Sequence, residues 1–318
     1  MPETVALILA AGKGTRMRTD RPKMLHEVCG VPMLEWVAQT SREAGATRVI
    51  AVVGHQKEVI KKHFRGLGVE WVDQDQQLGT GHAVMVAREA LRGVSGDVLV
   101  LCGDKPLIKA KTLAGMLASH RAQRASATIL TTRLDDPHGY GRIIKGRDGC
   151  IRAIVEELDA SPSQKRVKET NSGIYAFELK ALFAALDQVK PNNKKGEYYL
   201  TDAISVLYRR GKTVVGFDTA DFAQTLGVNS QQELAQVSRI ARADILKQLM
   251  DAGVTVIDPE STFVERGVKV GAGTVLYPFC YLDKGTEIGV GCRIGPFVHL
   301  RRGSRVPNGA QLRARAIP

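Results

Sequence analysis

Short, nearly uninterrupted runs of apolar residues recur along the first hundred positions of the chain. The runs Thr4–Ala10, Arg48–Val53 and Asp97–Cys102 are typical of strands that are buried on both faces. Between them, Pro32–Ala44 and Thr80–Leu91 have the spacing of amphipathic helices. Because strands and helices alternate in this way, the pattern predicts a doubly wound, Rossmann-like α/β domain with a parallel sheet covered on both faces.

After Pro106, the alternation of apolar strands and amphipathic helices becomes less regular. Strands are predicted at Ala127–Arg133 and Gly173–Phe177, with a glycine-rich segment at 137–142 and a hairpin around 146–149. We interpret this part as a mixed lobe that carries substrate contacts.

A helical pattern then runs from Gln231 to Ala252, with Asn229-Ser230 suited to cap it and Gly253 to end it. We interpret residues 230–258 as a connector between a domain at 1–229 and a C-terminal region at 259–318. The apolar stripe of this helix consists of Leu234, Val237, Ala241, Ile245 and Leu249.

The C-terminal region contains an internal repeat of six residues. An aliphatic residue stands at every sixth position, and the fourth residue after it is small or β-branched. This period is typical of a left-handed parallel β-helix with three hexads in each coil, so nine hexads predict about three coils. The aliphatic positions are Val264, Val270, Leu276, Leu282, Ile288, Ile294, Leu300, Val306 and Leu312. The small or β-branched positions are Val268, Thr274, Cys280, Thr286, Cys292, Val298, Ser304, Ala310 and Ala316.

Two expectations follow from the repeat. Cys280 and Cys292 occupy its small inward position, so we expect them to be packing residues. The hexads also continue almost to the last residue without an amphipathic cap. We therefore expect either a partner on the final coil or a chain that has been cut short.

The amino-acid composition argues against several classes of protein. The 318 residues are 44% hydrophobic and 25% charged, which suits a globular chain of two domains. No apolar run approaches the ~20 residues of a membrane span, and the N-terminal residues do not begin a signal peptide. The five cysteines and seven histidines lack the spacing of disulfide frameworks or zinc motifs. We expect a soluble, cytoplasmic protein without a membrane partner, in which any metal is held by oxygen.

The charge is unevenly distributed. Forty-five basic residues against 33 acidic ones give a net charge of +12, which favours an anionic partner. The last 26 residues contribute +6 of this without any acidic residue, but the clustered arginines lack a recognisable nucleic-acid-reading motif, so nucleic-acid binding is not expected. The basic residues of this tail are Arg293, Arg301, Arg302, Arg305, Arg313 and Arg315.

A glycine-rich loop follows the first predicted strand. Residues 9–17 read LAAGKGTRM, and Pro22-Lys23 follow shortly after. Gly12 and Gly14 allow backbone N–H groups to approach phosphate oxygens at the edge where doubly wound sheets bind ligands. Met17 stands where a dinucleotide-binding loop has its third glycine, and no Gly-Lys-Ser/Thr follows. The sequence therefore predicts a phosphate-binding loop of another kind.

Seven further segments follow this loop, and together the eight resemble the bacterial N-acetylglucosamine-1-phosphate uridyltransferases, a bifunctional family that also contains a glucosamine-1-phosphate acetyltransferase. The resemblance extends from Thr4 to about Asn229. It implies Mg²⁺-dependent uridylyl transfer from UTP to N-acetylglucosamine-1-phosphate, giving UDP-N-acetylglucosamine and pyrophosphate. The seven segments are QDQQLGTG at 74–81, GDKPL at 103–107, GYGRI at 139–143, IVE at 154–156, NSGI at 171–174, EYYLTD at 197–202 and GVN at 227–229.

The resemblance implies a role for each matching residue. Arg16 would bind the leaving β,γ-phosphates, and Lys23 the α-phosphate and the sugar phosphate, where charge builds in the transition state. Asp104 and Asn229 would be the oxygen ligands of Mg²⁺. Alternatively, the two cations are ordinary surface charges and Asn229 caps the helix that follows. No general base is expected, because a phosphate monoester is already mostly dianionic at neutral pH.

The resemblance also implies which residues would bind the base and the sugar. Gln74 would select a uracil base, and Glu156 would hold the sugar unless it is only a solvated charge at a strand end. Gly141 would let backbone approach the sugar. The complete implied substrate-binding set is Ala11, Gly12, Gly14, Gln74, Gly79, Thr80, Gly81, Gly141, Glu156, Asn171 and Thr201.

Two positions depart from the family pattern. Lys105 follows Asp104 where the family usually has an uncharged residue, so it would either repel Mg²⁺ or add a phosphate contact. Cys102 stands where a larger residue is common. These departures leave open a nucleotidyltransferase of other specificity, such as one acting on glucose-1-phosphate with TTP or UTP, and a non-catalytic sugar-nucleotide-binding protein.

The β-helix region matches the family only in part. The segment from Ile294 to Arg301 resembles the beginning of the acetyltransferase site, but the coils with that site's His, Tyr, Asn and Lys positions are missing. We therefore expect no acetyltransferase activity. Stacked coils present flat faces that suit association around a three-fold axis, so we expect a homotrimer.

Overall fold

The computed structural model describes residues 3–314, which form two compact units. Unit 1 comprises residues 3–25 and Met33–Asn229, and unit 2 comprises His26–Pro32 and residues 230–314. Within residues 3–314, no helix is long and apolar enough to cross a membrane.

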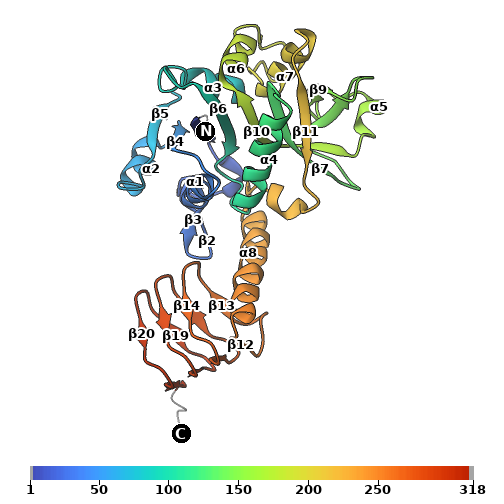
Figure 1. Ribbon diagram of the computed structural model, residues 1–318. Coiled ribbons are helices and arrows are strands. Elements are labelled where there is room, and N and C mark those ends of the chain that lie inside the picture. The colour runs from blue at the N-terminus through green and yellow to red at the C-terminus, as the bar shows by residue number, and fades with distance from the viewer. Residues whose placement is uncertain (1–2, 315–318) are drawn as a thin grey trace. The chain divides into compact units, whose positions relative to one another are not determined.

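Unit 1 is built around a mixed sheet, for which nine strands are found within the described residues (Figure 1). Strands β1, β4, β5 and β6 are mutually parallel, whereas β10 runs antiparallel to both β6 and β7. The main path in order is β11 (Val214–Asp218), β7 (Ala127–Arg133), β10 (Glu169–Glu178), β6 (Gly96–Cys102), β1 (Glu3–Ala10), β4 (Arg48–Val53) and β5 (Glu70–Asp73). The hairpin of β8 (Arg142–Lys145) and β9 (Ile151–Val155) lies off this path and pairs with β10.

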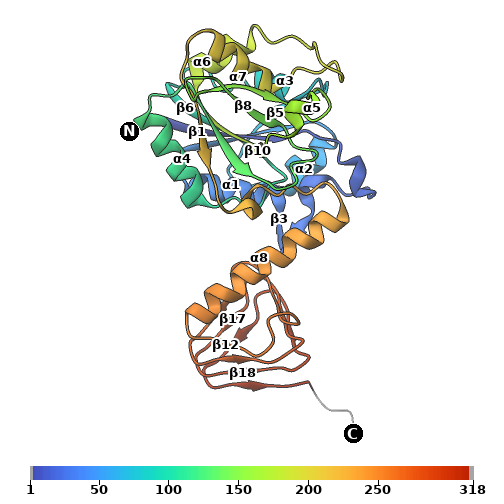
Figure 2. The same ribbon diagram turned by 90° about the vertical axis from the view of Figure 1, so that its right-hand side faces the viewer.

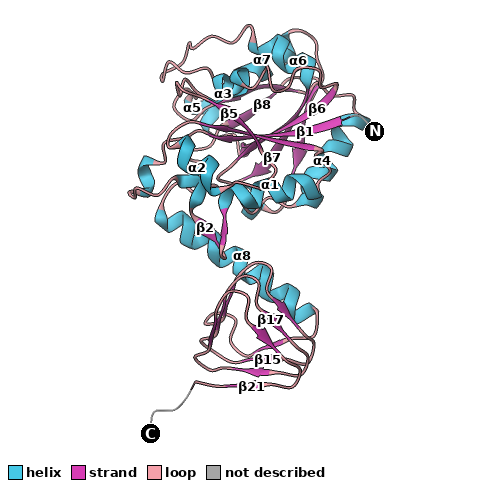
Figure 3. Ribbon diagram, turned by 90° about the vertical axis from the view of Figure 1, so that its left-hand side faces the viewer, coloured by secondary structure: helices cyan, strands magenta, loops and turns pink. Residues whose placement is uncertain are grey.

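Helices cover both faces of the sheet (Figure 3). Successive residues of β1 enter opposite apolar clusters, Leu7 one and Ile8 the other, as alternation along a strand requires. The cluster around Leu7 includes residues of α3 (Thr80–Val86), α6 (Leu179–Leu186) and α7 (Leu200–Arg209). The cluster around Ile8 includes residues of α1 (Met33–Glu43), α2 (Lys57–His63) and α4 (Ala110–Ala122). The short helix α5 spans Pro162–Lys165. The predicted doubly wound α/β architecture is confirmed.

Two details differ from the prediction. The helix expected to reach Leu91 ends at Val86, and turns follow it. Strands β7, β10 and β11 of the mixed lobe predicted after Pro106 continue the same sheet, a pairing that the sequence did not predict. The reason is that β10 is ten residues long and pairs with β6 as well as with β7, and such long-range pairing leaves no local signal in the sequence.

Unit 2 begins with the long helix α8 (Gln231–Asp251). Ser230 is its N-cap: the Ser230 hydroxyl accepts from the Glu233 backbone at 3.2 Å, and the Glu233 carboxylate accepts from the Ser230 backbone at 3.0 Å. Of the predicted capping pair, Ser230 is therefore the residue that caps α8.

The rest of unit 2 is a parallel β-helix made of two-residue strands, whose coils are visible in Figure 2. From Phe263 onward, paired strands lie 18 residues apart, which is three hexads, whereas Thr255-Val256 pairs with a strand 20 residues further on. The predicted aliphatic positions are the second residues of β13 to β21, and Cys280 and Cys292 are fully buried between the coils, so the predicted packing role is confirmed. Ala316 and Arg315 lie outside the described residues. The strands are β12 (Thr255–Val256), β13 (Phe263–Val264), β14 (Lys269–Val270), β15 (Val275–Leu276), β16 (Tyr281–Leu282), β17 (Glu287–Ile288), β18 (Arg293–Ile294), β19 (His299–Leu300), β20 (Arg305–Val306) and β21 (Gln311–Leu312).

A small hairpin from the first part of the chain belongs to unit 2. It consists of β2 (Glu27–Val28) and β3 (Val31–Pro32), and its turn residue Cys29 accepts a hydrogen bond from the Arg266 backbone at 2.9 Å. The sequence did not predict this hairpin, because a pair of two-residue strands outside any repeat is too short to show a pattern.

Candidate functional site

A cavity of 290 Å³ lies where β1 and β6 end, at their carboxyl ends. The loops after parallel strands meet at this edge of a doubly wound sheet, so residues far apart in the sequence line one cavity. Cys102 lines it together with seven predicted site residues: Ala11, Gly12, Lys23, Gln74, Gly79, Thr80 and Asp104.

The two glycines of the loop after β1 have different surroundings. Gly14 has a φ of 64°, and a Cβ there would lie 2.8 Å from the Cβ of Lys23, so glycine lets the lysine lie close. Nothing lies within 4 Å of a Cβ at Gly12, whose backbone therefore faces open space. Arg16 is exposed on the short helix Thr15–Met17 and does not line the cavity.

Lys23, Asp104 and Asn229 meet at one point. The Lys23 ammonium donates to Asp104 Oδ2 at 2.5 Å and to Asn229 Oδ1 at 2.8 Å. The Lys23 side chain is only 9% exposed, so it is not an ordinary surface cation. Because Ser230 caps α8, Asn229 is available for this contact. The Val228 backbone also donates to the Asp104 carbonyl at 3.0 Å, which joins the two loops.

Lys105 and Cys102, which depart from the family pattern, each donate a hydrogen bond to a backbone carbonyl. Lys105 donates from Nζ to the Thr225 carbonyl at 2.7 Å, so it ties down the segment that precedes Asn229. The Cys102 thiol donates to the Gly173 carbonyl at 3.2 Å. Burial, together with the charge of Asp104, raises the pKa of Cys102 to about 11. Cys102 is thus a neutral thiol in the wall of the cavity.

Gln74 and the QLGTG segment form a tight unit. Gln74 is 3% exposed, and its amide nitrogen donates to the Gly79 carbonyl at 3.2 Å and lies 3.0 Å from Nδ1 of His82. Gly79 has a φ of 109°, and a Cβ there would lie 2.6 Å from the carbonyl oxygen of Tyr198. The Gly81 backbone donates to that same carbonyl at 2.7 Å. Glycine is required here because two backbone segments touch.

A second cavity, of 610 Å³, shares Thr80 and Glu197 with the first. Glu156 lines it, and its Oε1 accepts from the Thr201 hydroxyl at 3.4 Å. A Cβ at Gly141 would lie 3.4 Å from Glu156 Oε1 and 3.5 Å from the Cβ of Asn171. The structure therefore brings together the four residues assigned to the sugar.

Glu156 is half-buried and is not a solvated charge at a strand end. Burial raises the pKa of its carboxyl, and the hydrogen bond from Thr201 partly opposes this shift.

The lining residues that were not predicted from the sequence include Gln77, Glu197 and Tyr199. Burial and nearby carboxylates raise the pKa of Tyr199 to about 12, so its hydroxyl stays protonated and able to donate. The EYYLTD segment contained the signal, because Glu197 and Tyr199 alternate along the chain that leads into α7, and Thr201 follows in its first turn.

The oxygen atoms beside Lys23 suit a hard cation. Mg²⁺ is commonly held by one or two protein oxygens and completed by substrate phosphates and water. Asp104 and Asn229 supply two such oxygens. Within residues 3–314, no group of three or more His, Cys, Asp or Glu residues is placed to hold a metal.

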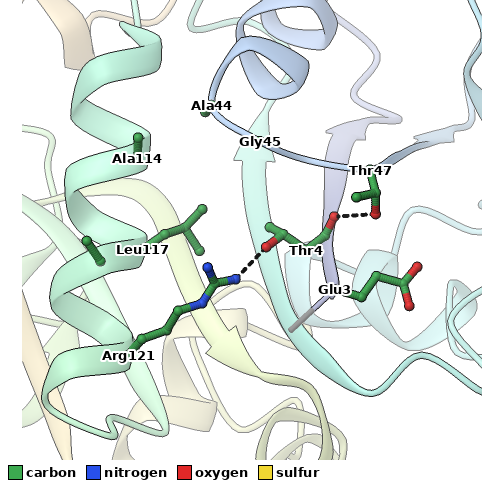
Figure 4. A pocket seen from close by; sticks show the side chains of 9 residues that line it. Glu3, Thr4, Ala44, Gly45, Thr47, Ala114, Leu117 and Arg121 are labelled. Atoms are coloured by element: carbon green, nitrogen blue, oxygen red, sulfur yellow. Dashed lines mark hydrogen bonds between the residues drawn. The ribbon is translucent and has the colours of Figure 1, made fainter. Parts of the chain in front are cut away.

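A further cavity, of 650 Å³, lies at the amino end of β1 (Figure 4). Thr4 and Arg121 line it, and Figure 4 shows the arginine pointing toward Thr4. Arg121 donates to Asp97 at 2.7 Å and to the Thr4 hydroxyl at 2.6 Å, so its charge is already paired. None of the predicted site residues lines this cavity, which leaves the carboxyl edge as the candidate site.

The fold and the site together define a nucleotidyltransferase. The profile of the MobA-like NTP transferase domain family matches residues 6–174, and the chain belongs to this family. A UDP-glucose pyrophosphorylase solved with UDP-glucose shares the fold, with a TM-score of 0.61 and 21% identity over 77% of this chain and the whole of that one.

The more similar relatives are described as bifunctional protein GlmU. The protein of Geobacter metallireducens is 46% identical over 283 residues, which cover 89% of this chain and 60% of that protein. The protein of Acetivibrio thermocellus is 46% identical over 274 residues, covering 86% of this chain and 59% of that protein. The predicted resemblance is confirmed, and the chain spans about 60% of the length of these relatives.

Proposed function

We propose that this protein transfers uridylyl groups from UTP to N-acetylglucosamine-1-phosphate and releases pyrophosphate. The observation that carries the proposal is the meeting of Lys23, Asp104 and Asn229 beside two adjoining cavities. The 290 Å³ cavity would take the nucleotide, and the 610 Å³ cavity lined by Glu156 would take the amino sugar. Similarity to the GlmU proteins supports the same reaction.

The reaction forms one bond and breaks one. A phosphate oxygen of the sugar-1-phosphate attacks the α-phosphorus of UTP, and the bond between that phosphorus and the bridging oxygen to the β-phosphate breaks. Mg²⁺, held by Asp104 and Asn229, would neutralise phosphate charge. Lys23 would bind the α-phosphate and the sugar phosphate, and Arg16, on its exposed turn, would bind the departing pyrophosphate.

The remaining residues would position the substrates. Backbone N–H groups at Gly12 would approach the phosphates, since nothing lies within 4 Å of a Cβ there. Gln74 and the segment 79–81 would hold the uracil, and Gly141, Glu156, Asn171 and Thr201 the N-acetylhexosamine. Correct positioning is the main requirement of this reaction, since the attacking group is already ionised.

We also propose three domains, at 1–229, 230–258 and 259–318, in a cytoplasmic homotrimer. Trimer formation is supported by two aromatic rings on the β-helix, Phe279 and Phe297, which are 56% and 65% exposed and stack with their planes 5° apart. The 318 residues lack the His, Tyr, Asn and Lys positions of the acetyltransferase site, so we propose that they do not carry out acetyl transfer.

The proposal is tested by measuring pyrophosphate release from UTP and N-acetylglucosamine-1-phosphate with Mg²⁺. We expect release by the wild-type chain and its loss in Asp104→Ala. TTP and glucose-1-phosphate serve as alternative substrates, and activity only with one of these would replace the proposed specificity. No release with any pair would favour a non-catalytic sugar-nucleotide-binding protein, and steeply salt-dependent binding to DNA would favour a nucleic-acid function.

A further inference from the structure

The Lys23 ammonium already occupies the cation position between Asp104 and Asn229. An ammonium has three N–H donors, and two of them account for the contacts at 2.5 and 2.8 Å. Both oxygens proposed as metal ligands are therefore engaged by a positive charge. A divalent cation bound to the same oxygens would lie within a few ångströms of that charge, where repulsion is strong.

The loops that carry the two oxygens are joined by hydrogen bonds that do not involve Lys23. The backbone bond from Val228 to the Asp104 carbonyl joins their loops at 3.0 Å. The Lys105 ammonium donates a hydrogen bond to the Thr225 carbonyl at 2.7 Å. Removing the Lys23 charge should therefore vacate the cation position and leave the loops that carry the two oxygens joined.

A half-buried carboxylate also needs a positive partner. The Asp104 side chain is 20% exposed, and leaving such a charge unpaired in the absence of substrate would be unfavourable. Lys23 supplies this partner from within the chain. When a nucleotide arrives, its phosphates offer the ammonium a second set of anionic oxygens, which frees Asp104 and Asn229.

We propose that Lys23 acts as an internal counter-cation, which keeps divalent cations from binding tightly to Asp104 and Asn229 until nucleotide phosphates draw its ammonium away. The free protein then binds the divalent cation weakly, and cation and nucleotide enter together. This inference rests on the proposed function, because it takes Asp104 and Asn229 as the metal ligands.

The test is Mn²⁺ binding to the full chain without nucleotide, measured by electron paramagnetic resonance of free Mn²⁺. We expect Lys23→Met to bind Mn²⁺ about 10- to 100-fold more tightly than wild type, the range for removing a competing charge-assisted hydrogen bond. Lys23→Arg keeps the charge and should stay weak. Lys13→Met removes an exposed charge from the same loop, and its affinity should stay within about fivefold of wild type.

Equal Mn²⁺ affinity in Lys23→Met and wild type would overturn the inference. So would a gain that persists in the double variant Lys23→Met, Asp104→Asn, because the cation would then be bound elsewhere. Lys23→Gln provides the same comparison if the methionine variant does not fold. If Lys23→Met gains Mn²⁺ affinity but the wild-type chain releases no pyrophosphate from any substrate pair, the inference is supported and the proposed reaction is refuted, so the two failures are distinguishable.

Discussion

Gly79→Ala tests whether the backbone of the QLGTG segment packs too closely against the EYYLTD segment to accommodate a side chain. Gly79 has φ 109° and ψ 176°, a conformation that is nearly exclusive to glycine. A Cβ at this position would lie 2.6 Å from the Tyr198 carbonyl oxygen, 2.9 Å from the Cβ of Glu197 and 3.0 Å from the Tyr198 nitrogen. Two of these atoms belong to the backbone, so a side chain cannot simply rotate away.

The expected loss of stability has two parts. Holding alanine in this conformation costs about 1–3 kcal/mol. Forcing two backbone segments apart adds about 1–3 kcal/mol, as in an overpacked core. Gly66→Ala is the matched control, because its φ is 85° but nothing lies within 4 Å of the added Cβ. Only the conformational part, about 1–2 kcal/mol, is expected there.

The assay is urea unfolding followed by tryptophan fluorescence. Trp36 and Trp71 are the two tryptophans of the sequence, and both belong to unit 1, as do Gly79 and Gly66. With a denaturant slope of about 3 kcal/mol per molar, Gly79→Ala should lower the midpoint by roughly 0.7–2 M and Gly66→Ala by roughly 0.3–0.7 M. A loss in Gly79→Ala no larger than in Gly66→Ala would refute the argument from the close approach.

Three further predictions concern the site and unit 2. Gly12→Ala should leave the urea midpoint unchanged but lower kcat/KM at least about tenfold, because its Cβ would meet only the approaching phosphates; an unchanged kcat/KM would refute this. Burial raises the pKa of Glu156, so its ionisation withdraws stability as pH rises above about 4.3. Glu156→Gln should therefore raise the thermal midpoint at pH 7 relative to wild type, with a smaller difference at pH 4; an equal difference at both would contradict the assigned cause. Ser230→Ala should destabilise α8 by about 1 kcal/mol, measured by circular dichroism at 222 nm, whereas Glu233→Gln keeps the capping acceptor and should have a smaller effect; equal losses would contradict the capping box.

The elements that rely on local pattern were predictable from the sequence. Buried strands such as Arg48–Val53 are runs of β-branched and aliphatic residues, and their bounds agree with the structure. The six-residue repeat placed the aliphatic position of every strand from β13 to β21, because each coil repeats one backbone geometry. The glycines of the first loop were recognisable because phosphate binding needs backbone without side chains.

The pairing of strands and the meeting of side chains depended on the tertiary structure. Lys23 lies 81 residues from Asp104 and 206 from Asn229, and only the sheet edge brings their polar atoms to within 2.8 Å. The resemblance to a family assigned roles to these residues, but it did not reveal that the lysine contacts both Asp104 and Asn229. The hairpin at 26–32 likewise joins unit 2 through contacts with residues far along the chain. Local sequence determines backbone preference and periodicity, whereas contacts between distant segments depend on the packing of the whole chain.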